Sequence, residues 1–575
     1  MNSVWRKELE ALTAKPEERF EAFYKDIAFG TGGLRAVMGP GRNRINHFVV
    51  GRITQGLANY LNRHNPDKTP RVCIAFDTRN YGEAFARHTA SVLCANGIKV
   101  MLFDQTRPTP MLSYAVRKHK ADAGIVITAS HNTKRYNGYK VYNATGGQLT
   151  GEAANEVTEE IERLDYFHDV KTMDRSEAEN QGLLTLMKRE MDDAYLADQK
   201  QWLTRPKYIR KNGNKIRILY TPLHGTGLLP VTSLLSELGF RDVHVVREQR
   251  DADGDFPTVY KPNPEDKNVF AIALEQAKSL KPDLIFATDP DADRLGVLSK
   301  GAGDAYEILT GTQLGALLTD YIIKARLDCE NMPKNPAVVS TIVTGTLAEH
   351  ICNANNVSYH KVLTGFKYIG EKMDEFKRTD KYSFLFGFEE SYGYLTGDSC
   401  RDKDAVLTSA LVSEAALWYK NEKDMTLWQA MQALYAEYRP VTERLLDYEF
   451  LGADGIKTMS AFMDNAREKA GKLIKGESVT FIEDYLTGER TDMSTGEQIK
   501  LTLPKSNVLK LFFADGAWLV LRPSGTEPKL KLYLCTDNAF SHGDSLADAE
   551  ARLEALIDKT VKLLPPDARK HRKPA

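Results

Sequence analysis

The sequence predicts an α/β protein built from several α/β units in succession, followed by a C-terminal α+β unit. At roughly 150 residues per domain, the 575 residues of the chain suggest about four domains. Short apolar runs alternate with helical patterns through most of the chain, as they do in α/β proteins. Near the C-terminus, strands follow one another closely before a final helix, which favours an antiparallel sheet there.

Eight runs rich in β-branched or aromatic residues are the expected strands of the α/β region. They are Arg71–Asp77, Ile98–Asp104, Gly124–Thr128, Lys215–Thr221, Asp242–Arg247, Leu284–Thr288, Ala337–Val343 and Ser383–Phe388. Helical patterns such as Gly82–Asn96 and Val231–Leu238 separate them. Because these strands are continuously apolar, we expect parallel or mixed sheets covered by helices on both faces.

Four strands and one amphipathic helix are expected in the last segment. They are Ser478–Tyr485, Val508–Phe513, Trp518–Arg522, Leu530–Thr536 and the helix Leu546–Leu564. The Pro- and Lys-rich tail, Pro565–Ala575, is expected to be frayed. Seams near Thr204–Lys207, Lys300–Gly303 and Tyr448–Asp454 divide the chain into four predicted domains. Their bounds are 1–204, 205–304, 305–447 and 448–575.

The composition is that of an ordinary soluble protein, with 42% hydrophobic and 27% charged residues. A formal net charge of −1 gives no field that would attract nucleic acid or a membrane, so neither is an expected partner. No apolar stretch approaches the roughly 20 residues that span a bilayer, and Met1–Lys25 lacks an apolar signal core. Six scattered cysteines without C-x-x-C spacing predict a cytoplasmic protein without disulfides. Nothing in the sequence indicates the oligomeric state.

An apolar run, Gly124–Ile127, ends abruptly in small and polar residues with Ser130 at the turn. His131 follows directly, and Lys140 lies further along. A hydroxyl at the end of a buried strand, surrounded by donors and cations, suits a nucleophile or a bound phosphate. A helix N-cap is the alternative, because serine is a favoured cap residue. The adjacent His131 and the later Lys140 favour a nucleophile or a phosphate site over a helix cap.

Three aspartates alternate after the apolar run Leu284–Thr288, at positions 289, 291 and 293. In an extended segment this spacing puts the carboxylates on one side, and all-oxygen ligands suit Mg²⁺. An EF-hand loop is excluded, because its sixth position would be Arg294 and its twelfth Lys300. A solvated acidic turn is the remaining alternative. Since Mg²⁺ often shares its site with a phosphate oxygen, a phosphoserine at Ser130 would complete the ligand set.

Two further motifs carry weaker signals. The glycine-rich segment Phe29–Arg35 matches neither a dinucleotide-binding fingerprint nor a P-loop. It either places Arg35 in contact with a phosphate or is a structural turn. A strand ends in Glu389, Glu390 and Ser391, whose side chains suit vicinal sugar hydroxyls. A strand-to-helix turn with a capping serine is the alternative for that segment.

The loop Leu521–Lys529 offers backbone N–H groups, two hydroxyls and the guanidinium of Arg522, a combination that suits a phosphate dianion. A plain β-turn is the alternative. The charge run Arg401–Asp404 has a solvated helix start as its default interpretation. Smaller polar pieces follow other strands. They are Asp77–Arg79, His224–Gly227 and Thr364–Lys367.

These motifs, in this order, resemble those of the α-D-phosphohexomutase superfamily. The resemblance rests on Ser130 with its neighbours, Asp289–Arg294, Glu389–Ser391 and Arg522–Thr526, and it covers about Phe29 to Thr536. The segments Tyr136–Lys140 and Glu389–Gly393 resemble the long phosphoglucomutase and phosphopentomutase branch. The resemblance implies four domains around a central cleft, of which the first three are similar α/β units and the fourth binds phosphate.

The resemblance also implies a reaction: interconversion of glucose 1-phosphate and glucose 6-phosphate through a phosphoserine at Ser130. Mg²⁺ would be bound by this serine and the three aspartates, and glucose 1,6-bisphosphate would be the intermediate and activator. His131 and Lys140 match residues placed for proton transfer, and either could be the base; Arg35 matches a residue near the transferring phosphate. The residues implied to bind the sugar phosphate are Arg294, Thr364, Gly365, Glu389, Ser391, Lys403, Arg522, Ser524, Gly525 and Thr526.

Three alternatives remain at this point. The preferred sugar phosphate could be a pentose phosphate, as in the phosphopentomutases, or mannose phosphate. The chain could also be a catalytically silent relative that binds sugar phosphates without turning them over. Because the serine and all three aspartates are present, the sequence favours an enzyme.

Overall fold

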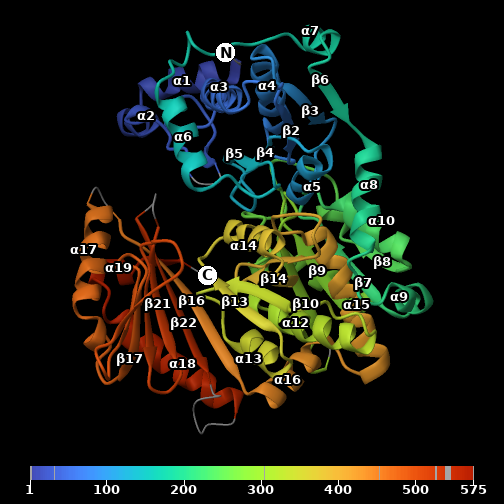
Figure 1. Cartoon of the computed structure of the whole chain (residues 1–575), viewed down its shortest axis with the longest axis vertical. Coiled ribbons are helices and arrows are strands. Elements are labelled where there is room, and N and C mark those ends of the chain that lie inside the picture. Colours follow the sequence, from blue (N-terminus) through green and yellow to red (C-terminus); the bar gives the residue numbers. More distant parts are fainter. Residues whose placement is uncertain are drawn as a thin grey trace. The chain divides into compact units, whose positions relative to one another are not determined.

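The computed structural model describes residues 3–30, 33–303, 305–451, 454–524, 528–537 and 545–573 (Figure 1). The chain forms two compact units. The first comprises residues 1–314, 321–339 and 365–428, and the second comprises 315–320, 340–364 and 429–575. No helix in the described part of the chain is both long and apolar enough to cross a membrane. The four domain bounds predicted from the sequence remain predictions.

The first α/β region has a six-stranded sheet of order β1-β5-β4-β2-β3-β6. Its strands are β1 (Leu34–Val37), β2 (Arg71–Phe76), β3 (Lys99–Phe103), β4 (Ala123–Ile127), β5 (Tyr136–Asn143) and β6 (Leu184–Met187). Its helices are α1 (Ser3–Thr13), α2 (Pro16–Phe23), α3 (His47–His64), α4 (Gly82–Ala95), α5 (Thr109–His119), α6 (Gly151–Glu162), α7 (Arg175–Asn180) and α8 (Arg189–Lys200). β2 pairs in parallel with β3 and β4, whereas β5 runs antiparallel to β4.

The second α/β region has a five-stranded sheet of order β11-β10-β9-β7-β8. Its elements are α9 (Pro206–Asn212), β7 (Arg217–Thr221), α10 (Leu228–Leu238), β8 (Asp242–Val245), α11 (Ala271–Leu280), β9 (Leu284–Thr288), β10 (Leu295–Lys300) and β11 (Tyr306–Leu309). β7 pairs in parallel with β8 and β9, and β10 returns antiparallel to β9. Short 3-10 turns lie at Gly213–Lys215, Arg247–Gln249 and Lys267–Phe270.

The third α/β region has a four-stranded sheet of order β13-β12-β14-β15. Its elements are α12 (Gly311–Asp328), β12 (Pro336–Thr341), α13 (Leu347–Ala354), β13 (Ser358–Val362), α14 (Phe366–Thr379), β14 (Ser383–Glu389), β15 (Gly393–Thr396), α15 (Ala405–Lys423) and α16 (Leu427–Tyr438). β12 and β14 are parallel, and β15 is antiparallel to β14.

The three sheets repeat one strand order. Four consecutive strands of each region, numbered by their sequence, lie in the order fourth, third, first and second: β5-β4-β2-β3, β10-β9-β7-β8 and β15-β14-β12-β13. In each case the third strand turns into an antiparallel fourth strand. This arrangement confirms the expectation of three similar α/β units. The connections between third and fourth strands contain the serine in the first region and the aspartates in the second, and the Glu389–Ser391 motif spans the end of β14 and the third connection.

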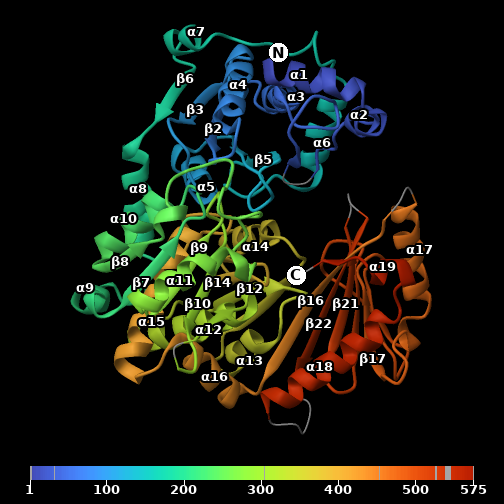
Figure 2. The same ribbon diagram turned by 180° about the vertical axis from the view of Figure 1, so that it is seen from behind.

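The C-terminal region lies in the second unit and forms an eight-stranded sheet of order β19-β18-β17-β20-β21-β22-β16-β23. Its strands are β16 (Val441–Glu449), β17 (Val479–Asp484), β18 (Glu489–Asp492), β19 (Gln498–Lys500), β20 (Leu509–Phe513), β21 (Trp518–Pro523), β22 (Lys529–Asp537) and β23 (Arg572–Lys573). Its helices are α17 (Gly455–Glu468), α18 (Leu546–Val561) and α19 (Pro566–Arg569), with a 3-10 turn at Ala470–Lys472. Figure 2 shows β16, β22 and β21 side by side, and all three pair antiparallel.

Burial explains why these elements form. β4 and β9 are apolar, rich in β-branched or aromatic residues and buried along their whole length, as expected of strands covered on both faces. One core cluster lies in the first α/β region and another in the second. In the C-terminal region, α17 and α18 contribute to a single core with the sheet, so both helices cover the same face.

One of the expectations about these elements is confirmed and one needs correction. The α/β sheets are mixed, as expected, because an antiparallel strand follows β4, β9 and β14. The tail expected to be frayed instead forms α19 and the short strand β23, which pairs antiparallel with β16. This pairing gives the backbone N–H and C=O groups of the tail partners in the sheet.

Candidate active site

The serine loop, residues 128–135, connects β4 to β5, so Ser130 is not a helix cap. Ser130 is fully buried and lies in the left-handed region, with a φ of 51°. Its backbone N–H donates to Thr128 Oγ1 over 2.8 Å. Its Oγ donates to Asp289 Oδ2 over 2.6 Å, and the same oxygen lies 3.1 Å from His131 Nδ1. The serine hydroxyl is therefore held against a carboxylate from another α/β region.

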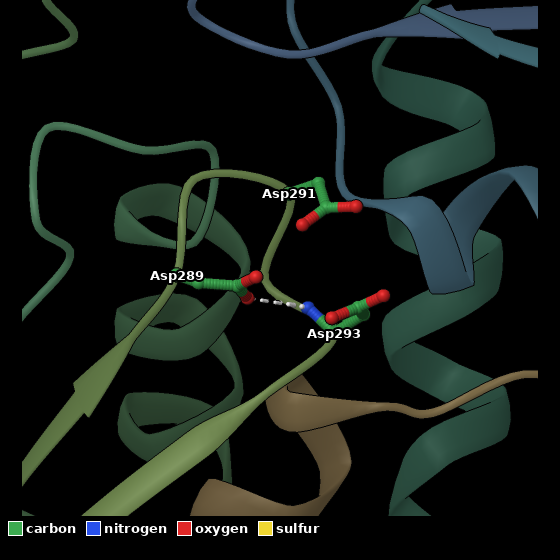
Figure 3. A group of neighbouring side chains, drawn as sticks. All are labelled: Asp289, Asp291 and Asp293. Carbon is green, nitrogen blue, oxygen red and sulfur yellow. Dashed lines mark hydrogen bonds between the residues drawn. The ribbon is translucent and has the colours of Figure 1, made fainter. Parts of the chain in front are cut away.

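The aspartate loop, residues 289–294, connects β9 to β10, and Figure 3 shows its three carboxylates projecting from one short segment. One ligand oxygen from each carboxylate can be chosen so that all three lie within 4.8 Å of one another. All three aspartates are buried. Asp289 Oδ1 accepts hydrogen bonds from the backbone N–H groups of Asp293 and Arg294 over 3.1 and 3.0 Å. The buried cluster excludes the solvated acidic turn.

Two buried lysines approach the aspartate loop. Lys140, on β5, donates from Nζ to Asp291 Oδ2 over 2.8 Å and lies 3.5 Å from Asp293 Oδ2. Lys403 Nζ lies 3.0 Å from the same oxygen of Asp293. Burial would lower the pKa of Lys403, but the neighbouring carboxylates, chiefly Asp293 and Asp402, raise it well above its usual value. Lys403 is therefore a permanent cation of the cluster.

The charge run around Lys403 is not a solvated helix start, because all of Arg401–Asp404 is buried. Asp404 caps α15 by accepting from the N–H of Leu407 over 2.9 Å. Asp402 accepts from Tyr142 Oη and Gln148 Nε2, and it also contacts Lys403. The run is thus a paired network that orients Lys403.

The three carboxylates repel one another, and Asp289 and Asp291 differ in proton affinity. Burial, and then the charges of Asp291 and Asp293, raise the pKa of Asp289 well above its usual range. Burial also acts on Asp291, but the cation of Lys140 and its hydrogen bonds hold the pKa of that carboxyl below its usual value. Because Asp289 favours its protonated form, a bound cation would stabilise the fully ionised cluster.

The donor set fits a hard divalent cation. All three side chains offer oxygen, the ligand type that Mg²⁺ prefers. Asp291 Oδ1 and Asp293 Oδ1 are buried, and among the described residues neither has a hydrogen-bond partner. Such buried acceptors are costly unless something binds them. The buried cluster is therefore consistent with a metal site.

His131 is half-buried beside the serine. Burial, and then the nearby cations, of which Arg294 has the largest effect, lower the pKa of His131 well below its usual value. The imidazole is therefore neutral near pH 7. Its Nδ1 faces Ser130 Oγ and can accept or donate a proton there, depending on the tautomer.

The third connection, between β14 and β15, is a hairpin turn rather than the start of a helix. Glu389 is the last residue of β14, and the half-buried Ser391 lies in the turn. Buried Glu389 accepts from the N–H of Gly365 over 2.7 Å. Burial, and then the charge of Glu390, raise the pKa of Glu389 to about 7. Arg294 pairs with Glu265, and it forms a backbone bridge with Gly393 at the hairpin.

The remaining predicted residues lie in separate segments of the chain. Arg35 is exposed on β1 and lies opposite Gly138 of β5. In the second unit, Thr364 precedes α14, and its hydroxyl is buried without a hydrogen-bond partner among the described residues. Arg522 lies at the end of β21, and Ser524 N–H donates to the carbonyl of Lys529 over 2.7 Å. Gly525 and Thr526 lie outside the described residues.

Two contacts were not expected from the sequence. Thr109, at the first turn of α5, donates from Oγ1 to Asp291 Oδ2 over 2.8 Å and from its backbone N–H to the Asp291 carbonyl. Arg79 contacts the backbone of the serine loop. A polar piece after a strand, Asp77–Arg79, was the only sequence signal for the second contact, and nothing in the sequence signalled the first.

Comparison with known proteins gives the same order of domains. The family descriptions "Phosphoglucomutase/phosphomannomutase, alpha/beta/alpha domain" I, II and III match residues 26–167, 193–303 and 310–438. The description "Phosphoglucomutase/phosphomannomutase, C-terminal domain" matches residues 468–553.

Curated relatives match over most of both chains. A phosphoglucomutase of Staphylococcus saprophyticus is 38% identical over 525 residues, covering 91% of this chain and 92% of the relative. A phosphoglucomutase of Staphylococcus aureus is 35% identical over 522 residues, covering 90% and 91%.

Solved structures support the fold. A putative phosphomannomutase from Thermus thermophilus has a TM-score of 0.68 at 22% identity, covering 94% of this chain and 99% of that one. The open form of parafusin, a phosphoglucomutase from Paramecium, has a TM-score of 0.67 at 16% identity, covering 93% and 94%.

The repeated α/β sheets, the antiparallel C-terminal sheet and the four matches define the class, which is that of the four-domain α-D-phosphohexomutases. The curated relatives narrow it further: this chain belongs to the phosphoglucomutase/phosphomannomutase family.

Proposed function

We propose that the protein is a phosphoglucomutase, which interconverts α-D-glucose 1-phosphate and glucose 6-phosphate through a phosphoserine at Ser130. One observation carries the proposal: Ser130 Oγ lies 2.6 Å from Asp289 Oδ2, at the edge of a buried cluster of three carboxylates. Relatives of the same length that are named phosphoglucomutase support the choice of reaction.

Ser130 would store the phosphoryl group between turnovers. In the first transfer, the bond between Ser130 Oγ and phosphorus breaks, and the free hydroxyl oxygen of the sugar phosphate bonds to phosphorus. The product is glucose 1,6-bisphosphate, and the hydroxyl proton ends on Ser130 Oγ. In the second transfer, the bond between the other sugar oxygen and its phosphorus breaks, that phosphoryl group bonds to Ser130 Oγ, and the serine proton ends on the released sugar oxygen. Positioning and charge neutralisation do most of the work in such transfers.

Asp289, Asp291 and Asp293 would hold Mg²⁺ together with a phosphate oxygen on Ser130. When bound, this ion neutralises charge on the transferring phosphoryl group. The chain's own cations contribute to the same task. Lys140 and Lys403 come from distant segments of the sequence. Both form ion pairs with Asp293 and so balance the charge of the carboxylates.

His131 and Lys140 are the candidates for proton transfer. The neutral imidazole of His131 lies 3.1 Å from Ser130 Oγ, within reach of the proton that this hydroxyl gains and loses. Lys140 is anchored on Asp291, where it would face the oxygens of a phosphoryl group on Ser130. We therefore assign the serine proton to His131 and charge neutralisation, as an ammonium ion, to Lys140.

The sugar phosphate would be bound by two groups of residues. Glu389 and Ser391, on the β14–β15 hairpin, would read the sugar hydroxyls, with Gly365 orienting Glu389. Arg35, Arg294 and Lys403 would contact the sugar or its transferring phosphate. The clamp on the other phosphate would comprise Thr364, Arg522, Ser524, Gly525 and Thr526. We also propose a cytoplasmic location, which is supported by free thiols at all six cysteines, five of them buried.

Substrate-specific kinetics test the proposal. Purified protein with Mg²⁺ and a trace of glucose 1,6-bisphosphate should convert glucose 1-phosphate with a higher kcat/KM than mannose 1-phosphate or ribose 1-phosphate. Intact-mass analysis should show a species heavier by about 80 Da, one phosphoryl group. A higher kcat/KM for ribose 1-phosphate would identify a phosphopentomutase, and no turnover of any of the three would indicate a silent sugar-phosphate-binding protein.

A further inference from the structure

Arg79 is a buried arginine directly after β2, and its guanidinium spans the serine loop. Only 3% of the residue is exposed. Nη1 and Nη2 each donate to two backbone carbonyls, three of them in the serine loop and one at the first residue of β5. The four acceptors are the carbonyl oxygens of Ser130 and Asn132, both at 2.5 Å, and of Thr133 and Tyr136, both at 2.9 Å. One side chain thus links three points of the serine loop to the start of β5.

The carboxylate of Asp77 contacts both the Arg79 guanidinium and the hydroxyl of Thr128, which in turn accepts from the N–H of Ser130. Its Oδ2 lies 3.3 Å from Arg79 Nε, and its Oδ1 accepts from the Arg79 N–H over 2.9 Å. The same Oδ2 accepts from Thr128 Oγ1 over 2.5 Å, and Thr128 Oγ1 accepts from the Ser130 N–H over 2.8 Å. The carbonyl of Ser130 is therefore fixed by Arg79 and its N–H by Thr128, and both groups are oriented by one carboxylate.

Ser130 needs such fixing because of its conformation. Its φ of 51° is uncommon for a residue with a side chain, and it persists only where surrounding contacts impose it. This conformation directs Oγ to Asp289 at 2.6 Å. A change at either backbone group of Ser130 would therefore move the oxygen relative to the aspartates.

We propose that Arg79 is a positioning residue for phosphoryl transfer, acting by holding Ser130 Oγ at the aspartate cluster. The inference rests on the proposed function of Ser130. Because Arg79 is paired with Asp77, its contribution is geometric rather than a net charge at the site. Lysine keeps the charge but cannot reproduce the planar fork that spans four carbonyls.

The test compares Arg79→Lys with Arg52→Lys in the full-length protein. Arg52 is a matched control: it is also buried, donates from Nε to the carbonyl of Leu164 over 2.8 Å, and pairs with Asp26. Arg79→Lys should lower kcat about 100-fold with little change in KM, because displacement of a reacting atom by about 1 Å can cost this much. Arg52→Lys should lower the melting temperature while leaving kcat unchanged.

A second pair of variants covers the case in which Arg79→Lys does not fold. Thr128→Val removes the hydroxyl that links Ser130 to Asp77 and should lower kcat, whereas Thr128→Ser keeps the hydroxyl and should retain most of it. A purely structural role would lower the melting temperature of Thr128→Val without separating kcat from that of Thr128→Ser.

The outcomes separate this inference from the proposed function. An active wild type with kcat of Arg79→Lys within about threefold of it, or equal kcat values for the two Thr128 variants, would overturn the positioning role alone. A wild type with neither turnover nor phosphoserine would overturn the proposed function and the inference with it.

Discussion

The serine loop and the aspartate loop lie at the same topological position but are held by different chemistry. Each connects the third strand of a repeated sheet to an antiparallel fourth strand. Each is supported by the polar segment that follows the first strand. In the first region, Arg79 donates three hydrogen bonds to the serine loop and a fourth to Tyr136, the first residue of β5. In the second, Thr226 donates from N–H and Oγ1 to the carbonyl of Pro290 over 2.8 and 2.9 Å.

The difference follows from the side chains that each loop presents. The serine loop presents a neutral hydroxyl, so the buried cation Arg79 can pair with Asp77 and also donate to the backbone of the loop. The aspartate loop presents three carboxylates, which already pair with Lys140 and Lys403. Its backbone is supported by the neutral hydroxyl and the N–H of Thr226, which add no further charge. The repeated fold thus supplies the positions, and the loop chemistry decides which support is compatible.

The largest expected effect is that of removing the serine hydroxyl. Ser130→Ala should lower kcat by at least about 10³-fold, because the supporting groups cannot act once the hydroxyl that carries the phosphoryl group is removed. Intact-mass spectra should lose the phosphorylated species. As a control, Ser113→Ala alters a buried serine that donates to the carbonyl of Gly146 over 2.6 Å. The control should keep its phosphoryl group, and a Ser130→Ala protein with near-wild-type turnover would refute the account.

Removing one aspartate charge should have the next largest effect. Asp291→Asn should raise the Mg²⁺ concentration for half-maximal activity by on the order of 10²-fold, since a neutral amide binds the ion more weakly. The exposed Asp251 gives a control, Asp251→Asn, that changes the same charge away from the cluster. Titrations of activity with Mg²⁺ would show the difference, and equal half-saturation in the two variants would argue against the metal site.

Weakening the support of the aspartate loop should have a smaller effect. Thr226→Val removes one of two hydrogen bonds to Pro290 and should cost about 1 kcal/mol of stability with a few-fold loss of kcat. Thr226→Ser should restore both. If Thr226→Val lowers kcat as much as Arg79→Lys, the proposed difference between the two loops is wrong. Thermal melts and steady-state kinetics measure both quantities.

The third loop predicts a pH effect on stability. Burial raises the pKa of Glu389 to about 7, above the roughly 4.3 of an unfolded chain, so the folded state binds more protons between these values. Stability should therefore fall as pH rises from about 4.3 to 7 and change little above that. Glu389→Gln has no carboxyl at this position and should lack this decline. The melting temperature of the variant minus that of the wild type should therefore increase by a few degrees between pH 5 and pH 7.5. A constant difference across that range would contradict the raised pKa.

The sequence predicted the strands that lead into the site but not those that leave it. β4 and β9 are short apolar runs with polar ends, a pattern that identifies buried strands. β5 was missed because Asn137, Gly138 and Lys140 interrupt its apolar pattern, although it is buried along most of its length. Lys140 contacts the aspartates, and Gly138 leaves room for the Thr128 carbonyl of the serine loop. Strand patterns fail where function replaces apolar side chains.

The site residues divide in the same way. The three aspartates and Ser130 were identifiable because each set follows its own strand in the sequence. The position of Lys403 came only from family resemblance, since a charge run is usually solvated and this one is buried against Asp293. The contacts of Arg79 were not predictable, because they join residues 51 or more positions apart through the order of strands in the sheet.

A single-turnover transfer experiment tests the central claim, that Ser130 carries the phosphoryl group to the sugar. Protein labelled with ³²P from glucose 1,6-bisphosphate is mixed with unlabelled glucose 1-phosphate and Mg²⁺, then quenched at short times. The account predicts that the label leaves Ser130 and enters glucose 1,6-bisphosphate at a rate at least equal to kcat. A label that stays on the protein during turnover, or that maps to a residue other than Ser130, would contradict it.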